Sequence, residues 1–187
     1  MNPDDAEGGG EDARSPQAAG EAGLLAILAT LVANEVEFLL VGGLAVGYHG
    51  YPRATKDIDI VPAPEARNLD KLWAALVALD AEMLALGEFR REELPVSLSA
   101  EELGRGANWD LRTTHGRLDV IQHVEGALEN SGDYERLRAG AIPARYAFGT
   151  VWVAGYDDLI DLKTLAGRDQ DLVDIRALRE ANEDTAP

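Results

Sequence analysis

One stretch, Phe38–Pro62 (FLLVGGLAVGYHGYPRATKDIDIVP), constrains the fold more than any other part of the chain. It begins with apolar residues that predict a buried strand, and it ends in an alternation of aspartate and isoleucine. Successive side chains of a strand point to opposite faces, so Asp57 and Asp59 are expected on one face and the isoleucines on the other. The stretch therefore predicts a sheet with a core on one side and two carboxylates on the other.

The glycine pair Gly42-Gly43 lies between these strands, ahead of a short apolar helix at Leu44–Tyr48. Glycine lets a ligand approach the backbone, and the N–H groups of a helix N-terminus bind phosphate. Two neighbouring carboxylates repel each other unless a cation keeps both ionised, and Mg²⁺ is typically held by one or two carboxylates plus substrate phosphates. Adjacent metal and phosphate sites are one interpretation; a solvated edge strand is the ordinary explanation of an isolated Asp-x-Asp alternation.

A third carboxylate comes from a later hairpin. Trp109–Thr113 and Arg117–His123 alternate in polarity about a Thr-His-Gly turn, which is typical of two paired strands. In the second strand Asp119 shares a face with Ile121 and His123. Asp119 is expected beside the first two aspartates if the strands are neighbours.

Together these residues resemble the nucleotidyltransferases of the DNA polymerase β superfamily, whose pattern is a Gly-Gly or Gly-Ser turn, an Asp-x-Asp and a later third acid. Within that superfamily the chain resembles the minimal branch of AbiEii- and MenT-like toxins. The residues that carry this second resemblance are His49, Arg53, Thr55, Lys163, Gly167-Arg168, Asp171 and Asp174.

The resemblance implies transfer of a nucleoside monophosphate from an NTP to a hydroxyl, with Mg²⁺ or Mn²⁺ as cofactor. It implies that Asp57, Asp59 and Asp119 bind the metal and that Lys163 neutralises the triphosphate. The remaining residues expected to bind the nucleotide are Gly42, Gly43, Arg53, Thr55, Arg168, Asp171 and Asp174.

Relatives in this branch modify the 3′ end of tRNA or a protein side chain, often beside a cognate antitoxin, so the chain is expected to be the toxin of such a pair. A small antibiotic acceptor, a non-catalytic binding or antitoxin-like module and a metal-dependent nuclease stay open. Lys163 also fits a solvated helix face, and Asp171 and Asp174 can orient Lys163 or Arg168, activate a hydroxyl, or be solvated.

Composition limits the partners. The chain has no cysteine, which excludes disulfides and thiolate sites and suits the cytoplasm, and no apolar run is long enough to anchor it in a membrane. The net charge of −17 opposes nucleic-acid binding unless a local basic groove exists. Candidates for such a groove are Arg53, Lys56, Arg105, Arg112, Arg117, Lys163 and Arg168.

The fold expected is α+β: a small, mixed, twisted sheet with helices on the face opposite the carboxylates and a helical C-terminal portion. Three regions are expected: a disordered acidic tail (1–20), a nucleotidyltransferase core (21–126) and a C-terminal strand pair with helices that complete the cleft (127–187). Ser99 is expected to cap a helical turn, and Asp157 or Asp158 the helix that carries Lys163.

Overall fold

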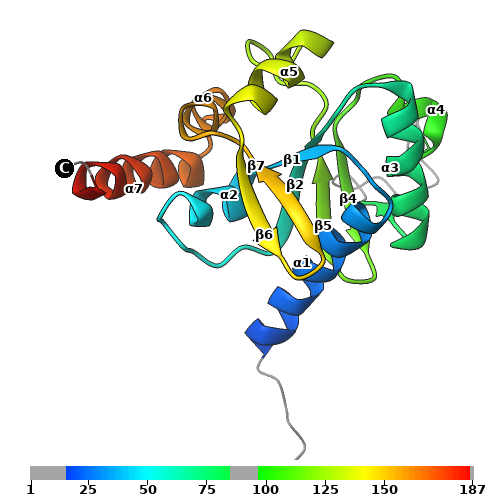
Figure 1. Cartoon of the computed structure of the whole chain (residues 1–187), viewed down its shortest axis with the longest axis horizontal. Coiled ribbons are helices and arrows are strands. Elements are labelled where there is room, and N and C mark those ends of the chain that lie inside the picture. The colour runs from blue at the N-terminus through cyan, green and yellow to red at the C-terminus, as the bar shows by residue number, and fades with distance from the viewer. Residues whose placement is uncertain (1–15, 85–96, 186–187) are drawn as a thin grey trace, which may run out of the picture.

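The computed structural model describes residues 16–84 and 97–185, and its elements follow one another as in Figure 1. The helices are α1 (Pro16–Ala33), α2 (Gly42–Tyr48), α3 (Ala66–Ala78), α4 (Ala100–Leu103), α5 (Ser131–Gly140), α6 (Tyr156–Ala166) and α7 (Asp169–Thr185). The strands are β1 (Phe38–Val41), β2 (Asp57–Pro62), β3 (Glu82–Met83), β4 (Trp109–Thr113), β5 (Gly116–Val120), β6 (Ile142–Tyr146) and β7 (Gly149–Val153).

All seven strands belong to one mixed sheet, in the order β3-β4-β5-β2-β1-β7-β6. β2 pairs parallel with β5 and β1 parallel with β7, whereas the other neighbours are antiparallel. The two strands that carry the predicted carboxylates are therefore direct neighbours. Because β7 extends the sheet beside β1, the C-terminal strand pair continues the sheet of the preceding region.

The main core lies on one face of the sheet. There α1, α3 and α4 cover inward-facing residues such as Leu40, Ile58 and Leu118, all of them fully buried. The opposite face carries a smaller apolar cluster that includes Val61 of β2 and Leu137 of α5. Helices thus pack opposite the carboxylates, as the sequence predicts, and a second, smaller cluster covers part of the carboxylate face.

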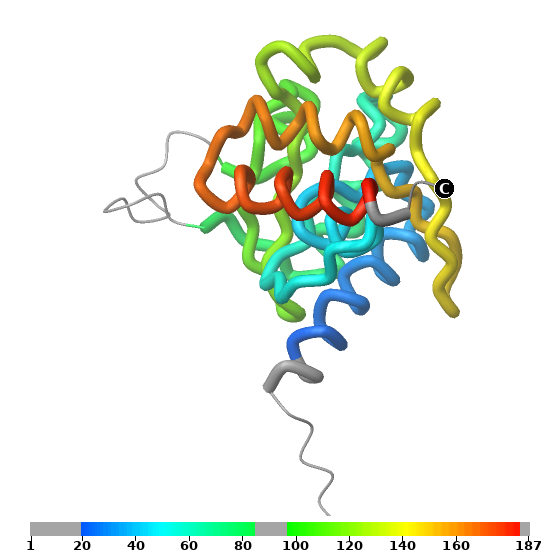
Figure 2. Tube along the Cα trace, turned by 90° about the vertical axis from the view of Figure 1, so that its left-hand side faces the viewer, coloured from blue at the N-terminus to red at the C-terminus, as the bar shows by residue number. Residues whose placement is uncertain are grey.

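The C-terminal helices lie at the side of the sheet away from α3 and α4 (Figure 1). Seen from that side, α6 and α7 run next to each other across the front of the molecule (Figure 2). α6 packs against both α7 and α2. This packing brings the C-terminal motif next to the glycine turn at the start of α2.

Several local predictions are confirmed. The hairpin of β4 and β5 forms, and the Ser99 side chain accepts a hydrogen bond from the amide of Glu102 at the start of α4. The prediction that Asp157 or Asp158 caps α6 is wrong: the N-cap is Gly155, and no side chain caps the helix. Asp157 and Asp158 lie inside the first turn, where their negative charges interact favourably with the positive end of the helix dipole.

The described part of the chain includes the last residues of the predicted acidic tail, where α1 already begins at Pro16; residues 1–15 lie outside it. None of the helices in 16–84 and 97–185 has the length and hydropathy of a membrane span.

Candidate functional site

The glycine turn lies directly against the first carboxylates. β1 ends at Val41, and Gly42 opens α2 with a φ of +63°, a conformation that L side chains rarely adopt. A methyl group on Gly42 would overlap the carboxylate of Asp59, and one on Gly43 would lie 2.8 Å from the hydroxyl oxygen of Thr55. Glycine at position 42 therefore lets the helix N-terminus approach Asp59 this closely, and glycine at position 43 leaves room for Thr55.

The parallel register of β2 and β5 sets Asp59 directly beside Asp119. Asp57 lies two residues before Asp59, and its Oδ1 accepts a 2.9 Å hydrogen bond from the hydroxyl of Thr55. Within the described residues, Oδ1 of Asp119 is buried without a hydrogen-bond partner. The third acid predicted from the hairpin parity therefore lies next to the Asp-x-Asp pair.

Burial and mutual repulsion perturb these carboxyls. Burial raises the pKa of Asp59, the charge of Asp57 raises it further, and an N–H of Gly43 and the charges of Arg168 and Lys163 oppose the rise only in part. Burial raises the pKa of Asp119 to about 7, with further contributions from Asp59, Asp110 and Asp57. Such carboxyls share a proton or take up a cation.

A divalent cation requires several oxygen ligands that lie close together. In 16–84 and 97–185, no group of three or more His, Cys, Asp or Glu side chains is arranged to hold a metal ion. Asp57 is turned toward Thr55, which leaves Asp59 and Asp119 as the adjacent carboxylates. One or two carboxylates, with waters and substrate phosphates, are the usual protein ligands of Mg²⁺, so this pair and the unpartnered oxygen of Asp119 fit such an ion.

The C-terminal motif forms a buried ion network. Nζ of Lys163 lies 2.9 Å from Oδ1 of Asp171 and 2.7 Å from Oδ2 of Asp174, and all three side chains are at most 6% exposed. Arg53 donates two hydrogen bonds to Asp174, at 2.8 and 2.9 Å. Nε of Arg168 donates to Asp171 at 2.8 Å. Three cations thus share two carboxylates.

The network accounts for the ionisation of both aspartates. Burial alone would raise the pKa of Asp171, but hydrogen bonds from Arg168 and Lys163 outweigh it and the pKa lies below the usual value. Burial likewise opposes the lowering of the pKa of Asp174, which hydrogen bonds from Arg53, Lys163 and Gln170 nevertheless bring about. Both carboxylates are therefore charged at neutral pH.

A cavity of about 90 Å³ connects this network with the carboxylates. Gly42 and Asp59 line it from the sheet side, and Leu159, Lys163 and Arg168 from the helix side. The side chain of Arg168 is 75% exposed although its Nε is bound, so the rest of its guanidinium is accessible. Five of the predicted site residues line this cavity: Gly42, Asp59, Lys163, Arg168 and Asp171. The other six lie outside its lining: Asp119 beside Asp59 in the sheet, Arg53 and Asp174 in the ion network, and Gly43, Thr55 and Asp57 around the glycine turn.

The three histidines lie apart from this cavity. Nε2 of His49 lies 2.8 Å from the carbonyl oxygen of Ala154, and its ring packs edge-on against Tyr156, a structural role. His115 lies in the β4–β5 turn and His123 follows β5. None of the three is among the residues that line the cavity.

Two residues that contact or influence the site aspartates were not predicted from the sequence. Asp110 lies directly opposite Asp119 across the hairpin, and the alternation of β4 was the signal that could have placed it there. Gln170 donates a 2.9 Å hydrogen bond to Asp174, four residues along α7. That spacing is a helical neighbour pair and was readable once the helix was assigned.

Several solved structures resemble this one in fold. The lincomycin-bound lincosamide antibiotic adenylyltransferase LnuA matches with a TM-score of 0.55 and 16% identity, over 85% of this chain and 96% of that one. The solution structure of the antibiotic-resistance factor ANT(2'')-Ia matches with a TM-score of 0.51 and 14% identity, over 87% of this chain and 83% of that one. Its complex with adenylyl-2''-tobramycin gives 0.51 and 16%, over 84% and 87%.

No protein-family model and no curated protein sequence matches the chain. The likeness to these solved structures shows that the chain has the polymerase β-like nucleotidyltransferase fold. The AbiEii- and MenT-like assignment rests on the sequence motifs alone.

Proposed function

We propose that the protein is a metal-dependent nucleotidyltransferase that moves a nucleoside monophosphate from an NTP to a hydroxyl of an acceptor molecule. The observation that carries this proposal is the pair Asp59 and Asp119, in register on neighbouring parallel strands and directly against the Gly42-Gly43 turn. The triphosphate of an NTP would lie beside this turn, where glycine leaves the backbone open, with its α-phosphorus facing the two carboxylates. The shared fold of known nucleotidyltransferases supports the same reaction class.

In the proposed reaction the acceptor oxygen attacks the α-phosphorus, a new O–P bond forms, and the bond from the α-phosphorus to the bridging oxygen breaks. Pyrophosphate leaves with the electron pair of that bond. Asp119, the carboxylate directly beside Asp59, takes the proton of the acceptor hydroxyl. Asp59 and Asp119 would hold Mg²⁺ or Mn²⁺, and Asp57 would join them by giving up its hydrogen bond with Thr55. The ion would supply charge neutralisation at the phosphates and lower the pKa of the hydroxyl.

Positive charge for the leaving pyrophosphate comes from the C-terminal motif. Arg168 offers its free guanidinium nitrogens beside Asp59, and Lys163 lines the same cavity. The network carries one more cation than carboxylates, because Arg53, Lys163 and Arg168 share Asp171 and Asp174. That surplus favours a polyphosphate at this end of the site.

The acceptor that fits best is a small molecule. Of the cations considered for a basic groove, Arg53, Lys163 and Arg168 belong to the ion network, Arg105 pairs with Glu101 and Glu102, and Arg112 pairs with Glu82. Lys56 and Arg117 are then the two candidates outside these ion pairs, against a net charge of −17 that opposes the binding of a nucleic acid. LnuA, which shares the fold, is named a lincosamide antibiotic adenylyltransferase, and ANT(2'')-Ia is named an antibiotic-resistance factor; both names favour a small acceptor.

A tRNA or protein acceptor, as in toxins with a cognate antitoxin, is the alternative, and it rests on the sequence motifs. In the test, the full chain is incubated with each α-³²P-labelled NTP in the presence of Mg²⁺ or EDTA. The acceptor offered in each reaction is total tRNA, cell lysate protein or a panel of hydroxylated antibiotics. Label on one acceptor class, lost with EDTA, identifies that class.

The matched variants are Asp59→Asn, at the site, and Asp161→Asn, an exposed aspartate on α6. We expect the first to abolish transfer and the second to leave it unchanged. Binding of Mg²⁺–NTP without any transfer would favour the non-catalytic module, and cleavage of tRNA without NTP would favour a nuclease. Either result overturns the transferase proposal.

A further inference from the structure

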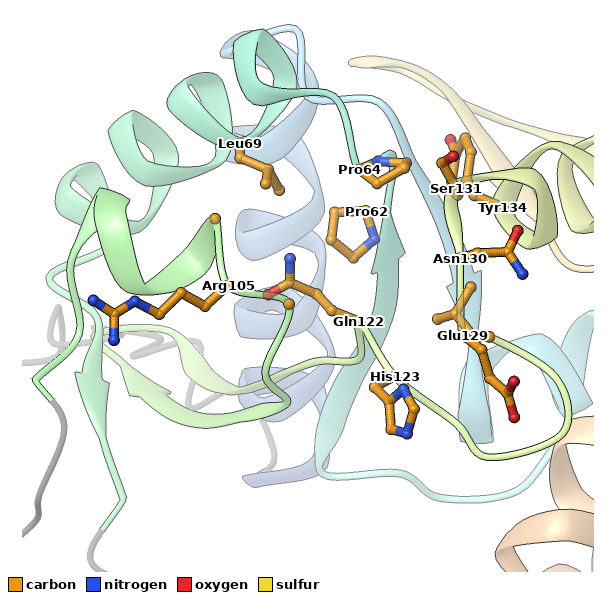
Figure 3. Close-up of a pocket in the computed structure, with 13 residues that line it drawn as sticks. Pro62, Pro64, Leu69, Arg105, Gln122, His123, Glu129, Asn130, Ser131 and Tyr134 are labelled. Carbon is orange, nitrogen blue, oxygen red and sulfur yellow. The ribbon is translucent and has the colours of Figure 1, made fainter.

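A second hollow, separate from the cavity at the carboxylates, lies where β2 and β5 end (Figure 3). It is a groove of about 270 Å³, and Pro62, the last residue of β2, is among the residues that line it. Gln122 and His123 enter it directly after β5. In open sheets, the space outside the carboxyl ends of parallel strands is a preferred place for ligands.

The floor of this groove is held firmly. Asn108 accepts hydrogen bonds from the amides of Gln122 and His123, at 2.8 and 2.9 Å, and donates one to the carbonyl of His123 at 2.8 Å. The side-chain amide of Gln122 donates to the carbonyl of Leu103 at 3.0 Å. A floor fixed by four hydrogen bonds needs little reorganisation to receive a ligand.

The two walls differ in chemistry. Pro62, Pro64 and Leu69 form an apolar wall, whereas Ser131 and Tyr134 face it from α5 (Figure 3). The side chains of Ser131, Tyr134 and His123 have no hydrogen-bond partner among the residues in 16–84 and 97–185.

The α5 wall is rigid as well, and the floor has an unmet acceptor. A capping box between Asn130 and Asp133 fixes the N-terminus of α5. Oε1 of Gln122 is buried without a donor in the described residues. One apolar wall and several unpaired polar groups are typical of a site for a ring with hydroxyl or amino substituents.

The groove and the proposed reaction centre lie along the same two strands. The pairing of β2 and β5 continues past Val120, because the amide of Ile121 donates to the carbonyl of Ile60 at 2.8 Å. Extended chain rises about 3.3 Å per residue, so Gln122 lies about 10 Å along the strand from Asp119. A ligand that occupies the groove and also presents a hydroxyl to Asp119 must span that length.

The charges at the rim favour a neutral or cationic occupant over a phosphorylated one. Arg105, the cation of the groove lining, already pairs with Glu101 and Glu102 on α4. Glu129, on the opposite side, adds negative charge. A neutral or amino-substituted ligand meets no repulsion here, whereas a phosphate would.

We propose that this groove binds the distal end of the acceptor, and that the acceptor is an elongated, hydroxylated small molecule of two or more rings. Its ring faces pack on Pro62, Pro64 and Leu69, and its polar substituents face His123, Ser131 and Tyr134. This inference rests on the proposed transferase function and specifies its acceptor.

The test uses the full chain, Mg²⁺ and α,β-methylene-ATP, with methyl α-D-glucopyranoside, maltose, lincomycin and tobramycin as calorimetric probes of increasing length. Ser131→Trp fills the groove from an exposed position, and Ala139→Trp places the same bulk on an exposed part of α5 outside the groove. We expect a multi-ring probe to bind the wild type, with its Kd raised about tenfold or more by Ser131→Trp and less than about twofold by Ala139→Trp. The single-ring glucoside should bind far more weakly.

Two results overturn the groove assignment: the nucleotide analogue binds but no multi-ring probe does, or the multi-ring probes bind Ser131→Trp as tightly as wild type. Failure of the analogue itself to bind the wild type with Mg²⁺ would instead count against the transferase function. The probes then still report on the groove, since their binding is measured without turnover.

Discussion

The buried network around Asp174 yields a prediction that stability measurements can test directly. The Asp174 side chain is 0% exposed and accepts hydrogen bonds from Arg53, Lys163 and Gln170. Asp174→Asn keeps the shape but removes the charge, and Lys163 then keeps a single carboxylate partner, Asp171, among the described residues. Breaking a buried ion pair on one side typically costs about 3–5 kcal/mol, because the remaining charge stays buried.

A loss of that size is a large part of the roughly 5–15 kcal/mol that stabilises a typical domain. The free energy of unfolding is measured by urea denaturation at pH 7, followed by circular dichroism and tryptophan fluorescence. Asp161→Asn, on the exposed face of α6, is the control and is expected to change it by less than about 0.5 kcal/mol. A loss below about 1 kcal/mol for Asp174→Asn would refute the reasoning.

The same variant has a defined pH dependence. The pKa values of Asp171 and Asp174 in the folded protein lie below the ordinary 3.8, so their contribution is complete above about pH 4. It is lost as the pH falls through the lowered values, when both carboxyls protonate. The difference between wild type and Asp174→Asn should therefore shrink below pH 4, and a difference that stays constant to pH 3 would contradict the assignment.

Other variants test the carboxylates, the turn and a helix cap. Asp119→Asn should abolish transfer. It should also stabilise the fold by about 1 kcal/mol at neutral pH, because the raised pKa of Asp119 means that its ionised form destabilises the folded state. In denaturation at several pH values, this gain in the free energy of unfolding should grow between pH 4 and 7 and then level off. Gly42→Ala should lower the free energy of unfolding by about 1–3 kcal/mol, because φ at this position is positive and the new methyl group would overlap Asp59. It should also abolish the binding of Mg²⁺–NTP, measured by calorimetry. Gly47→Ala is the control: the nearest atom would lie 3.7 Å from its methyl group, so this variant should be as stable as wild type or more stable. Asn130→Ala should lower the thermal midpoint by removing about 1 kcal/mol of capping energy without changing NTP binding.

The strands and their faces were readable from sequence because their signals are local. The alternation in β2 and in the β4–β5 hairpin fixed which residues are buried, and Ser99 marked the start of α4. The prediction that Asp119 lies beside Asp59 depended on one further condition, that β2 and β5 are neighbouring strands. The parallel pairing of these strands confirms that condition.

The C-terminal motif could not be interpreted from sequence in the same way. The resemblance implied that Lys163 neutralises a triphosphate, while the sequence left Asp171 and Asp174 with several possible roles. The structure pairs these three side chains with one another and with Arg53, which comes from a loop far away in the chain. The groove at the ends of β2 and β5 likewise combines segments that no local pattern relates.

The sequence by itself determined the carboxylate pair, the glycine turn and most element positions, since these depend on residue period, backbone freedom and capping within a few positions. Only the tertiary structure decided which cations the aspartates hold and where a second ligand can bind. The physical reason is that charge pairing and cavity shape depend on distances between side chains that only the packed chain brings together.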